Sequence, residues 1–411
     1  MNAALTVRPL TEIASVTDTR DPTLPPGLSL PSRRHRWWAV PVVVLSAAVL
    51  VCVSVLAVLP SSLIAEEFNP RVEEDQPAPY ARTPASAVET GGLVLYGDLD
   101  GVADVYPADG ELYLVTVTEP SQSVLSWLIG REHPAIQFLT EEGKFGFQTP
   151  QQRRTFALEQ MRTSEQVAQY VALERVGYDV ELIAGDVLIE GMVCLVPNDD
   201  GTECIEWSPS DDVLDPGDRV LSVEGVEIDG VEDLGAVLEG YAPGDTVVMV
   251  IDRPEEGEIE VEVELTASPE EPDRTIVGFY PFDTRRVVLP FELDIDAGRI
   301  GGPSAGLAFT LTLIDELTEG ELTGGERVAV TGTIQLDGSV GAIGGLRQKA
   351  SAVDQTGIEL FIVPASQGEE DLAAAREAAG PDVEIVPVAT LDEALAVLEE
   401  RGGDPIPPAL P

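Results

Sequence analysis

The sequence predicts a multidomain chain of mixed α+β and α/β structure that follows a single apolar helix. Three observations lead to this fold class. Residues 37–59 are an apolar run, short β-like segments separated by turn residues fill 183–268, and strands alternate with helices from about residue 280 onward. A length of 411 residues is enough for two or three domains with cores of their own.

The apolar run from Trp37 to Leu59 is 23 residues long, or about 34 Å of helix, which spans a bilayer. A signal-peptide core would be shorter and would precede a small-residue cleavage site, so we favour a retained single-pass anchor over a cleaved signal. The positive-inside rule places segment 1–36 in the cytoplasm and everything after residue 60 outside the cell membrane. The flanking charges behind this orientation are Arg33, Arg34 and Arg36 before the run and Glu66, Glu67, Glu73, Glu74 and Asp75 after it.

The formal charge of -49 is unevenly distributed, because residues 1–60 carry +2 and residues 61–411 therefore carry -51. An acidic body of this kind repels phosphate backbones, so we expect no nucleic-acid partner. Solubility or adaptation to salt accounts for the acidity, and attraction of basic substrates is the second interpretation.

Histidine and lysine are scarce. The histidines are His35, which lies in the basic run, and His133, so a Ser/His/Asp triad or a His-rich metal site would depend on His133 alone. We expect neither, and no cofactor. Basic side chains are almost all arginine, yet Lys144 and Lys349 remain. An amine can lose its proton near neutral pH, whereas a guanidinium cannot. Either lysine could therefore act as a base where an arginine could not.

The three cysteines allow two interpretations. Cys52 lies in the apolar run, whereas Cys194 and Cys204 flank a polar turn of Pro, Asn, Asp and Gly residues. If the body is extracytoplasmic, a Cys194–Cys204 disulfide is predicted, worth about 2–3 kcal/mol for so short a loop. A catalytic cysteine paired with His133 is the alternative.

Two stretches between the apolar run and the β-rich region show no motif for chemistry. Residues 60–90 are rich in Pro, Ala, Glu and Thr without a period, which predicts a linker. Residues 91–182 predict a separate α+β module, with a strand over 112–117 and a helix over 164–176.

Residues 183–268 follow the order strand, turn, helix, strand, strand. In segments 215–225 and 243–247 they resemble the PDZ domains of bacterial envelope proteases. Such domains bind an extended peptide or a C-terminus as an added strand at a sheet edge. The loop between Cys194 and Cys204 interrupts the segment where that groove is expected, so a purely structural role remains the alternative.

A serine stands at a predicted helix start near residue 304. Residues 287–295 alternate as a strand, 298–302 are glycine-rich, and an apolar helix follows Ser304 as far as about Leu317. The backbone N–H groups of Gly302 and Ser304 could hold an oxyanion there, since Pro303 has none. The alternative is an ordinary N-cap serine after a glycine turn.

One of the two lysines falls early on another predicted helix. A strand over 328–336, a hairpin turn at Asp337-Gly338 and a return strand over 340–343 lead through Gly344-Gly345 to the helix with Lys349. Desolvation beside a positive helix end would lower the lysine pKa, so that the neutral amine could take a serine proton. A surface charge is the alternative interpretation.

These segments resemble the proteolytic domain of Lon proteases in three signatures that stand in the family's order, over about residues 280–402. The resemblance implies that Ser304 is the nucleophile, Lys349 the general base and later acid, and Thr331 the hydroxyl that orients the lysine. Gly301 departs from the pattern, because many Lon enzymes carry an acidic residue there. The signatures are Gly302-Pro303-Ser304-Ala305-Gly306, Thr331-Gly332-Thr333-Ile334 and Ile343-Gly344-Gly345-Leu346-Arg347-Gln348-Lys349.

The sequence contains no phosphate-binding glycine loop followed by Lys-Ser or Lys-Thr, so we expect no ATP-driven motor. The order of anchor, module, PDZ-like domain and Lon-type domain, with a Pro-rich tail over 403–411, resembles the membrane-anchored PDZ-Lon peptidases of Gram-positive bacteria. That resemblance implies an ATP-independent serine endopeptidase that cleaves flexible or unfolded envelope and membrane proteins.

Two other functions compete with the endopeptidase. One is a catalytically silent adaptor whose PDZ-like domain captures partners, and the other is a Ser/Lys hydrolase of small amides or esters. Lon-type domains often form rings, which raises the prospect of an oligomer, yet a charge of -51 on residues 61–411 opposes close assembly at low salt.

Overall fold

The computed structural model describes residues 39–69, 74–99, 101–145, 148–197, 204–254, 256–269 and 271–406. The chain divides into two compact units, Met1–Val53 and Ser54–Pro411. Three features of the sequence lie outside the described residues, namely the N-terminal segment 1–36, the turn at 198–203 and residues 407–411 of the tail.

Helix α1 spans Ala39–Val58 and lies within the predicted apolar run. Its segment Val40–Val58 is long and apolar enough to cross a membrane, and none of it is buried inside the protein. A continuous apolar surface of this length is unfavourable in water, so it needs a cover such as the hydrocarbon of a bilayer.

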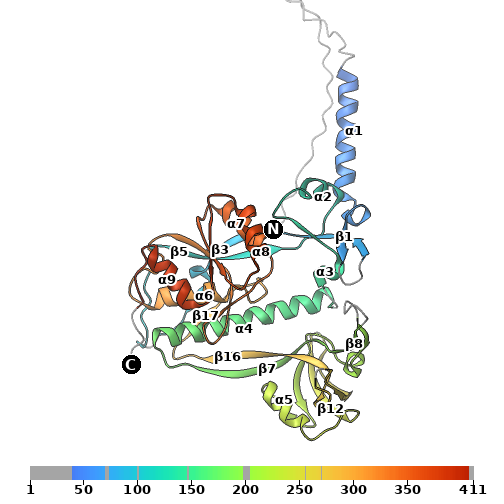
Figure 1. The fold of residues 1–411 in the computed structure, drawn as a ribbon, viewed down its shortest axis with the longest axis vertical. Coiled ribbons are helices and arrows are strands. Elements are labelled where there is room, and N and C mark those ends of the chain that lie inside the picture. The colour runs from blue at the N-terminus through green and yellow to red at the C-terminus, as the bar shows by residue number, and fades with distance from the viewer. Residues whose placement is uncertain are drawn as a thin grey trace, which may run out of the picture. The chain divides into compact units, whose positions relative to one another are not determined.

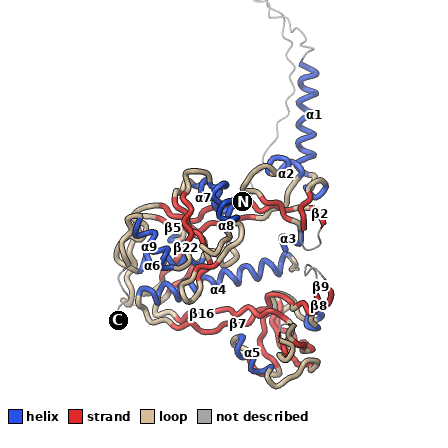
Figure 2. The backbone as a smooth tube through the Cα atoms, in the orientation of Figure 1, coloured by secondary structure: helices blue, strands red, loops and turns tan. Residues whose placement is uncertain are grey.

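A six-stranded sheet of order β22-β21-β18-β5-β3-β6 forms the α/β domain (Figures 1 and 2). Neighbours among β22, β21, β18 and β5 pair in parallel, whereas β3 pairs antiparallel with β5 and β6. The strands are β3 (Tyr80–Glu89), β5 (Glu111–Thr118), β6 (Gln137–Leu139), β18 (Arg327–Val330), β21 (Leu360–Pro364) and β22 (Glu384–Val388). The helices are α4 (Pro150–Val176), α6 (Gly306–Leu317), α7 (Leu346–Thr356), α8 (Glu369–Ala379) and α9 (Leu391–Glu400).

The two faces of this sheet have separate cores, because successive side chains of a strand point to opposite faces. Val328 and Val330 belong to the core formed with α4, α6 and α9. Ala329, between them, belongs to the core formed with α7 and α8. Strands covered on both faces read as continuous apolar runs, as parallel strands usually do.

Helix α4 is the longest described helix, and its ends are set by local sequence. The Thr149 Oγ1 accepts a hydrogen bond from the Gln152 N–H, the Gln152 Oε1 accepts one from the Thr149 N–H, and Pro150 occupies the first turn. Gly177 ends the helix in the left-handed region, at φ 97°. The prediction of a helix over 164–176 found only its second half.

The α/β domain is discontinuous in sequence, which differs from the predicted division into domains. Strand β5 pairs in parallel with β18, with Leu112 opposite Val328, although the whole β-rich domain lies between them in the chain. Residues 91–182 are therefore part of the same domain as 289–402 and not a separate module. Local patterns identified the strand at 112–117, but they do not reveal a partner so distant in sequence.

The stretch 60–90 also differs from the predicted linker. It contains the hairpin β1 (Glu66–Asn69) and β2 (Glu74–Pro77), followed by β3. Strand β3 includes Pro84 beside an irregularity in its pairing with β5, and a break in the ladder is where a sheet tolerates proline. Pro84 is thus accommodated in a strand, and Pro77 is the last residue of β2.

A second sheet of order β13-β12-β10-β7-β16, wholly antiparallel, forms the PDZ-like β domain with helix α5. The domain keeps the predicted order of strand, turn, helix, strand, strand. Strands β7 and β16 pair along most of their length and connect this domain to the α/β domain (Figure 1). The elements are β7 (Glu181–Met192), β10 (Arg219–Val223), β11 (Val226–Glu227), α5 (Val231–Leu238), β12 (Thr246–Arg253), β13 (Gly257–Glu264) and β16 (Phe279–Val288).

Shorter elements complete the fold. The predicted strand at 328–336 is divided at Thr331-Gly332 into β18 and the short strand β19, and β20 is the predicted return strand. The predicted strand 287–295 is likewise divided, because Pro290 lies between β16 and β17. The elements are α2 (Val124–Gly130), α3 (Glu141–Phe145), β4 (Val94–Tyr96), β8 (Cys194–Pro197), β9 (Cys204–Trp207), β14 (Thr266–Ala267), β15 (Thr275–Ile276), β17 (Leu293–Ile295), β19 (Thr333–Ile334) and β20 (Val340–Gly341).

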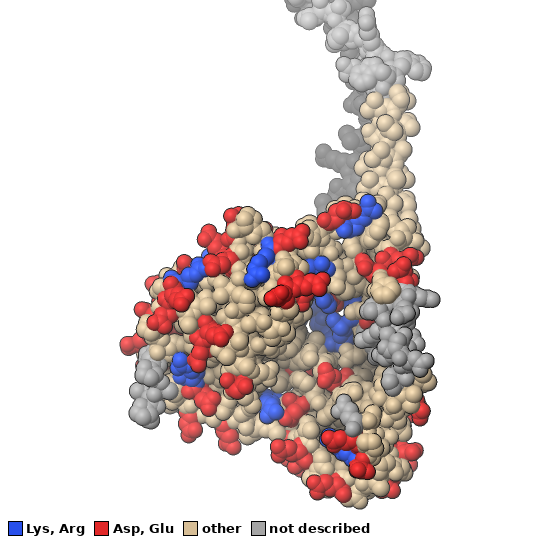
Figure 3. Space-filling model, in the orientation of Figure 1, with Lys and Arg blue, Asp and Glu red and all other residues tan. Residues whose placement is uncertain are grey.

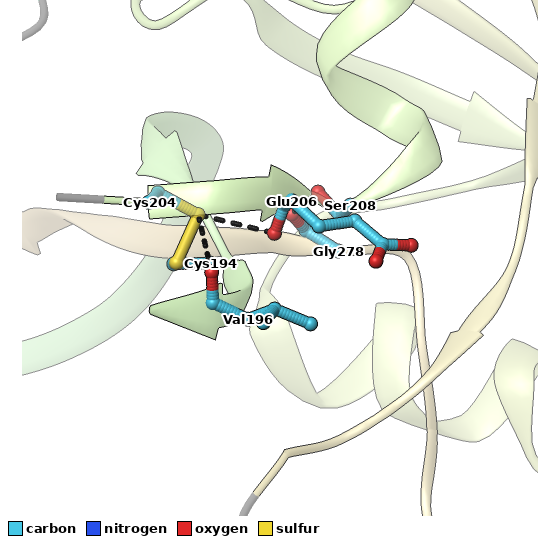
Figure 4. Close-up of a disulfide and its surroundings, with 6 residues drawn as sticks. All are labelled: Cys194, Val196, Cys204, Glu206, Ser208 and Gly278. Carbon is cyan, nitrogen blue, oxygen red and sulfur yellow. Dashed lines mark hydrogen bonds between the residues drawn. A yellow bond between two sulfur atoms is a disulfide. The ribbon is translucent and has the colours of Figure 1, made fainter. Parts of the chain in front are cut away.

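Cys194 and Cys204 form a disulfide in the structure, and their Cα atoms are 5.6 Å apart (Figure 4). The bond joins strands β8 and β9 of a short antiparallel hairpin. At the base of this hairpin, the Ser208 hydroxyl donates to the Gly278 carbonyl oxygen at 2.5 Å. The hairpin is thereby fastened to the segment that leads into β16.

The two described strands of the disulfide hairpin, β8 and β9, lie outside the cleft beside α5. A cleft of about 660 Å³ lies between α5 and the segment Asp273–Pro281, and no residue of β8 or β9 lines it. Strand β16 is the last strand of its sheet, so part of its outer edge borders this cleft. The sequence predicted that the loop between Cys194 and Cys204 interrupts the peptide groove, but strands β8 and β9 at its two ends do not line this cleft.

We predict that protein prepared from the cell envelope contains the Cys194–Cys204 disulfide. Replacing both cysteines with serine should lower the free energy of unfolding of the β domain by about 2–3 kcal/mol, because the unfolded loop gains conformations. Mass spectrometry of unreduced peptides and thermal denaturation measure the two effects.

Cys52 provides an internal control, because it is a free thiol on α1. In detergent it should be alkylated without reduction, whereas Cys194 and Cys204 should need a reductant. Alkylation of all three thiols in unreduced protein would contradict the prediction.

Candidate active site

Ser304 lies in the turn that precedes helix α6. Residues 306–317 form this helix, in which apolar residues predominate and all but Glu316 are buried. The Ser164 hydroxyl of α4 donates to the Pro303 carbonyl oxygen at 3.0 Å, which holds the turn from outside. A Cβ atom at Gly306 would lie 2.7 Å from that hydroxyl oxygen, so α4 and the turn approach too closely for any other residue.

Lys349 lies in the first turn of α7 and reaches the serine. Helix α7 begins after Gly345, whose φ of 72° suits glycine. The lysine is only 3% exposed, and its Nζ lies 2.7 Å from the Ser304 Oγ. Burial disfavours the ammonium form and lowers the pKa of Lys349 to about 7. Near neutral pH a large fraction of this amine is therefore uncharged.

Thr331 completes a hydrogen-bonded triangle at the end of β18. Its Oγ1 accepts from the Lys349 Nζ at 2.8 Å and donates to the Ser304 carbonyl oxygen at 3.1 Å. The Gly332 N–H donates to the same carbonyl oxygen at 3.0 Å. Because the hydroxyl proton of Thr331 is used on that carbonyl, Thr331 can only accept from the lysine, which orients the amine.

The predicted oxyanion pair requires a correction. The Gly302 N–H donates to the Ala157 carbonyl oxygen of α4 at 2.7 Å, so it is not available to a substrate in this structure. The Ser304 N–H makes no hydrogen bond within the described part of the chain. Sequence reasoning missed Ala157 because a backbone acceptor on a distant helix leaves no motif.

The same helix accounts for the departure at Gly301. A Cβ atom there would lie 3.0 Å from the Ala157 Cβ and 3.2 Å from the Ala157 carbonyl oxygen. An acidic side chain would need α4 to move away. The Thr149 and Gln152 capping box is a sequence signal for the start of α4. No local pattern, however, indicates that α4 contacts the turn before Ser304.

The alternative of a cysteine–histidine site is not assembled in the structure. Cys194 and Cys204 are bonded to each other, and Cys52 lies on α1. The His133 Nδ1 accepts from the Ala135 N–H at 3.1 Å, which is a local loop contact. Within the described ranges, no group of three or more His, Cys, Asp or Glu side chains is placed to hold a metal ion.

Ser304 and Lys349 open into a cleft of about 600 Å³. Its walls come from β5, from the loop before Ser304 and from residues 342–344. A larger cleft of about 1050 Å³ shares Arg153, Gly301 and Gly302 with it and extends to the β domain at Trp207 and Asp215. The two clefts therefore adjoin each other at these three residues.

Comparison with solved structures gives partial matches to the β domain. The PDZ domain of an SdrC-like protein from Listeria monocytogenes aligns with 22% of this chain and 87% of its own, at 19% identity and a TM-score of 0.17. The corresponding domain from Listeria innocua aligns with 22% of this chain and 92% of its own, at 20% identity and a TM-score of 0.16.

Comparison with curated proteins finds several Lon proteases. That of Metamycoplasma arthritidis is 34% identical over 87 residues, which are 21% of this chain and 10% of that protein. That of Xanthomonas oryzae is 42% identical over 72 residues, 18% and 8% of the two chains. That of Mesomycoplasma hyopneumoniae is 27% identical over 162 residues, 36% and 18% of the two chains. The chain thus covers less than a fifth of the length of these relatives.

The sequence profile described as "Lon protease (S16) C-terminal proteolytic domain" matches residues 295–400. This range includes Ser304, Thr331 and Lys349, the residues that meet in the structure. Residues 295–400 therefore belong to a Lon-type proteolytic domain, and this part of the chain is distantly similar to the Lon proteases.

Proposed function

We propose that this protein is an ATP-independent serine endopeptidase with a Ser304–Lys349 dyad. The observation that carries the proposal is the buried amine of Lys349, 2.7 Å from the Ser304 hydroxyl and with its pKa lowered to about 7. A Lon-type proteolytic domain supports peptide-bond hydrolysis as the reaction class. The sequence contains no P-loop motif to bind ATP for an unfolding motor.

In the proposed mechanism the neutral Lys349 amine accepts the Ser304 hydroxyl proton as the serine oxygen attacks the peptide carbonyl. The Ser304 N–H is available to the oxyanion of the tetrahedral intermediate. The Lys349 ammonium then gives its proton to the leaving amine, and an acyl-enzyme remains. Water repeats the sequence with the same base and releases the acid product.

The β domain is proposed to help substrate recognition. The cleft between α5 and the β14–β16 region borders the edge of a sheet, and backbone groups at such an edge can pair with an extended peptide. The larger cleft leads from this domain toward the serine. Without a motor, the substrates are flexible or already unfolded segments of envelope and membrane proteins.

We also propose that α1 is a retained anchor with the N-terminus in the cytoplasm. Its length and composition suit a bilayer, although a signal sequence passes the same test. Arginines precede it and acids follow it, which supports an extracytoplasmic body. The disulfide fits that oxidising compartment.

The silent-adaptor alternative requires that the dyad be inert. The lowered pKa of Lys349 argues against this alternative. Burying a lysine beside a serine costs folding free energy, and an inert scaffold would not need that arrangement. A small-amide or ester hydrolase is tested by comparing casein with small ester substrates.

We predict that Ser304→Ala and Lys349→Ala each abolish casein cleavage by the full-length protein without ATP. Lys349→Arg should fail to restore it, because a guanidinium cannot shed its proton near neutral pH. Thr331→Val should cost about ten- to hundredfold in kcat, since it removes one hydrogen bond that orients the base. Gel assays and fluorogenic peptides measure these rates.

Thr310→Val is the matched control for Thr331→Val, since it removes an equally buried hydroxyl that donates to the Gly306 carbonyl oxygen at 2.9 Å and does not line the cleft. Circular dichroism should show folded proteins throughout. Near-normal cleavage by a folded Lys349→Arg protein would mean that the lysine is not the base.

We predict that kcat/KM rises with pH through about 7 and then levels. The active form is the neutral amine, so lowering the pH below the Lys349 pKa of about 7 should reduce the rate nearly tenfold per unit. Peptide cleavage between pH 5.5 and 9 measures the profile, with thermal stability followed at each pH. A midpoint near 10 would show that the amine is not desolvated.

We predict that a protease added outside protoplasts digests the body but spares the first 36 residues. The reason is the charge asymmetry around α1. Epitope tags at the two termini report which end is protected, and lysed protoplasts provide the control. Protection of the C-terminal tag together with loss of the N-terminal tag would reverse the proposed topology.

A further inference from the structure

The cleft beside Ser304 carries a charge opposite to that of the rest of the body. Its lining includes Arg82 from β3, Arg153 from α4 and Arg299 from the loop before the serine. Among the described residues that line it, Glu119 is the one carboxylate. In the whole chain, acids outnumber lysines and arginines by 73 to 24. Figure 3 shows basic atoms inside the central hollow, whereas most of the other charged atoms on this face are acidic.

Glu119 cannot neutralise all three guanidinium groups. Its Oε1 lies 2.8 Å from the Arg82 Nη2, and its Oε2 lies 3.4 Å from the Arg153 Nη2. Arg299 is exposed and makes no ion pair or hydrogen bond with any residue that the structure describes. Three positive groups against one negative group leave the cleft with excess positive charge.

The adjoining larger cleft has the opposite sign. It shares Arg153 with the catalytic cleft, but its other charged lining residues are Glu142, Glu190, Asp211 and Asp215. The positive charge is therefore confined to the part of the path that faces Ser304. A general property of the surface, such as solubility, does not explain this local reversal.

A guanidinium presents a fork of N–H donors that matches a carboxylate, and such charge-assisted pairs strengthen in a partly dehydrated cleft. A cleft of 600 Å³ is roughly 10 Å across, which is about three residues of extended peptide. Beyond a Debye length of about 8 Å at physiological salt, the acidic body is largely screened, so these nearby arginines dominate.

We propose that the catalytic cleft selects peptide segments with a carboxylate within about three residues of the cleaved bond, held by Arg82, Arg153 and Arg299. The inference rests on the proposed peptidase function and names its substrate class. The carboxylate has two sources, an Asp or Glu side chain or the C-terminus of the substrate, and the experiment separates them.

The test uses full-length protein in detergent and fluorogenic peptides that differ only by Glu or Gln, scanned through the three positions on each side of the bond. Each peptide is made with a free or an amidated C-terminus. At the best position, kcat/KM should favour Glu by about tenfold, the effect of one hydrogen bond to a charged group. If instead the C-terminal carboxylate is the source, the Glu/Gln ratio should be near one and amidation should lower kcat/KM by about tenfold.

Arginine variants assign the preference to residues. Arg153→Gln and Arg299→Gln should each reduce the Glu/Gln ratio by about threefold, and the double variant should bring it near one. Arg299→Glu should shift the preference toward a Lys-containing peptide. Arg162→Gln is the matched control, since Arg162 is an exposed residue of α4 that pairs with Glu159 at 2.8 Å. Its ratio should equal that of the wild type.

Binding provides a measurement that does not depend on turnover. The full-length Ser304→Ala protein should bind a fluorescein-labelled Glu peptide more tightly than its Gln counterpart in anisotropy titrations. The difference should shrink as salt rises from 50 to 500 mM, because the charges are partly exposed.

The outcomes separate this inference from the proposed function. Ser304-dependent cleavage with a Glu/Gln ratio of one at every position and no effect of amidation overturns the inference and leaves the peptidase intact. So does a carboxylate preference that the arginine variants leave unchanged. Absence of any Ser304-dependent cleavage overturns the proposed function. In that case, equal binding of Glu and Gln peptides overturns the carboxylate preference as well.

Discussion

Contact between the Lys349 amine and the Ser304 hydroxyl requires that a lysine be kept out of water, and much of the α/β domain serves this requirement. Gly345 lets α7 begin close to β3 and β5, where a Cβ atom would lie 3.1 Å from both the Arg82 Cδ and the Val117 Cγ1. Thr331 supplies the only acceptor besides Ser304 that the structure describes for the amine. Burial that is costly for an ammonium thus yields a neutral amine at the serine.

Helix α4 links the serine turn to the β domain through contacts along its length. Its Ser164 and Ala157 bond to the turn before α6. Its Gln166 side chain accepts from the Val287 N–H of β16 at 2.8 Å, and its Gln152 side chain donates to Asp215 at 3.3 Å. Helix α4 therefore contacts both the turn that carries Ser304 and the adjoining larger cleft, and it contributes Arg153 to the cleft beside Ser304.

The charged residues that line the cleft beside Ser304 are mainly basic, although the chain as a whole is strongly acidic. Acids outnumber lysines and arginines by 73 to 24 in the chain, yet three arginines line the cleft beside Ser304. The sequence contains the arginines in three separate segments that have no common motif. The three arginines come together only because β3, α4 and the loop before Ser304 pack around one cleft.

The sequence by itself determined the apolar helix, the β-rich domain and the glycine-bounded signatures around Ser304, Thr331 and Lys349, because caps, turns and short periodic runs are local. Tertiary structure decided the rest. It joined β5 to β18 across the intervening β domain, buried the Lys349 amine beside the serine and used the Gly302 N–H for a bond to Ala157. Each of these contacts joins residues that are far apart in the chain. Such long-range contacts leave no pattern in the local sequence.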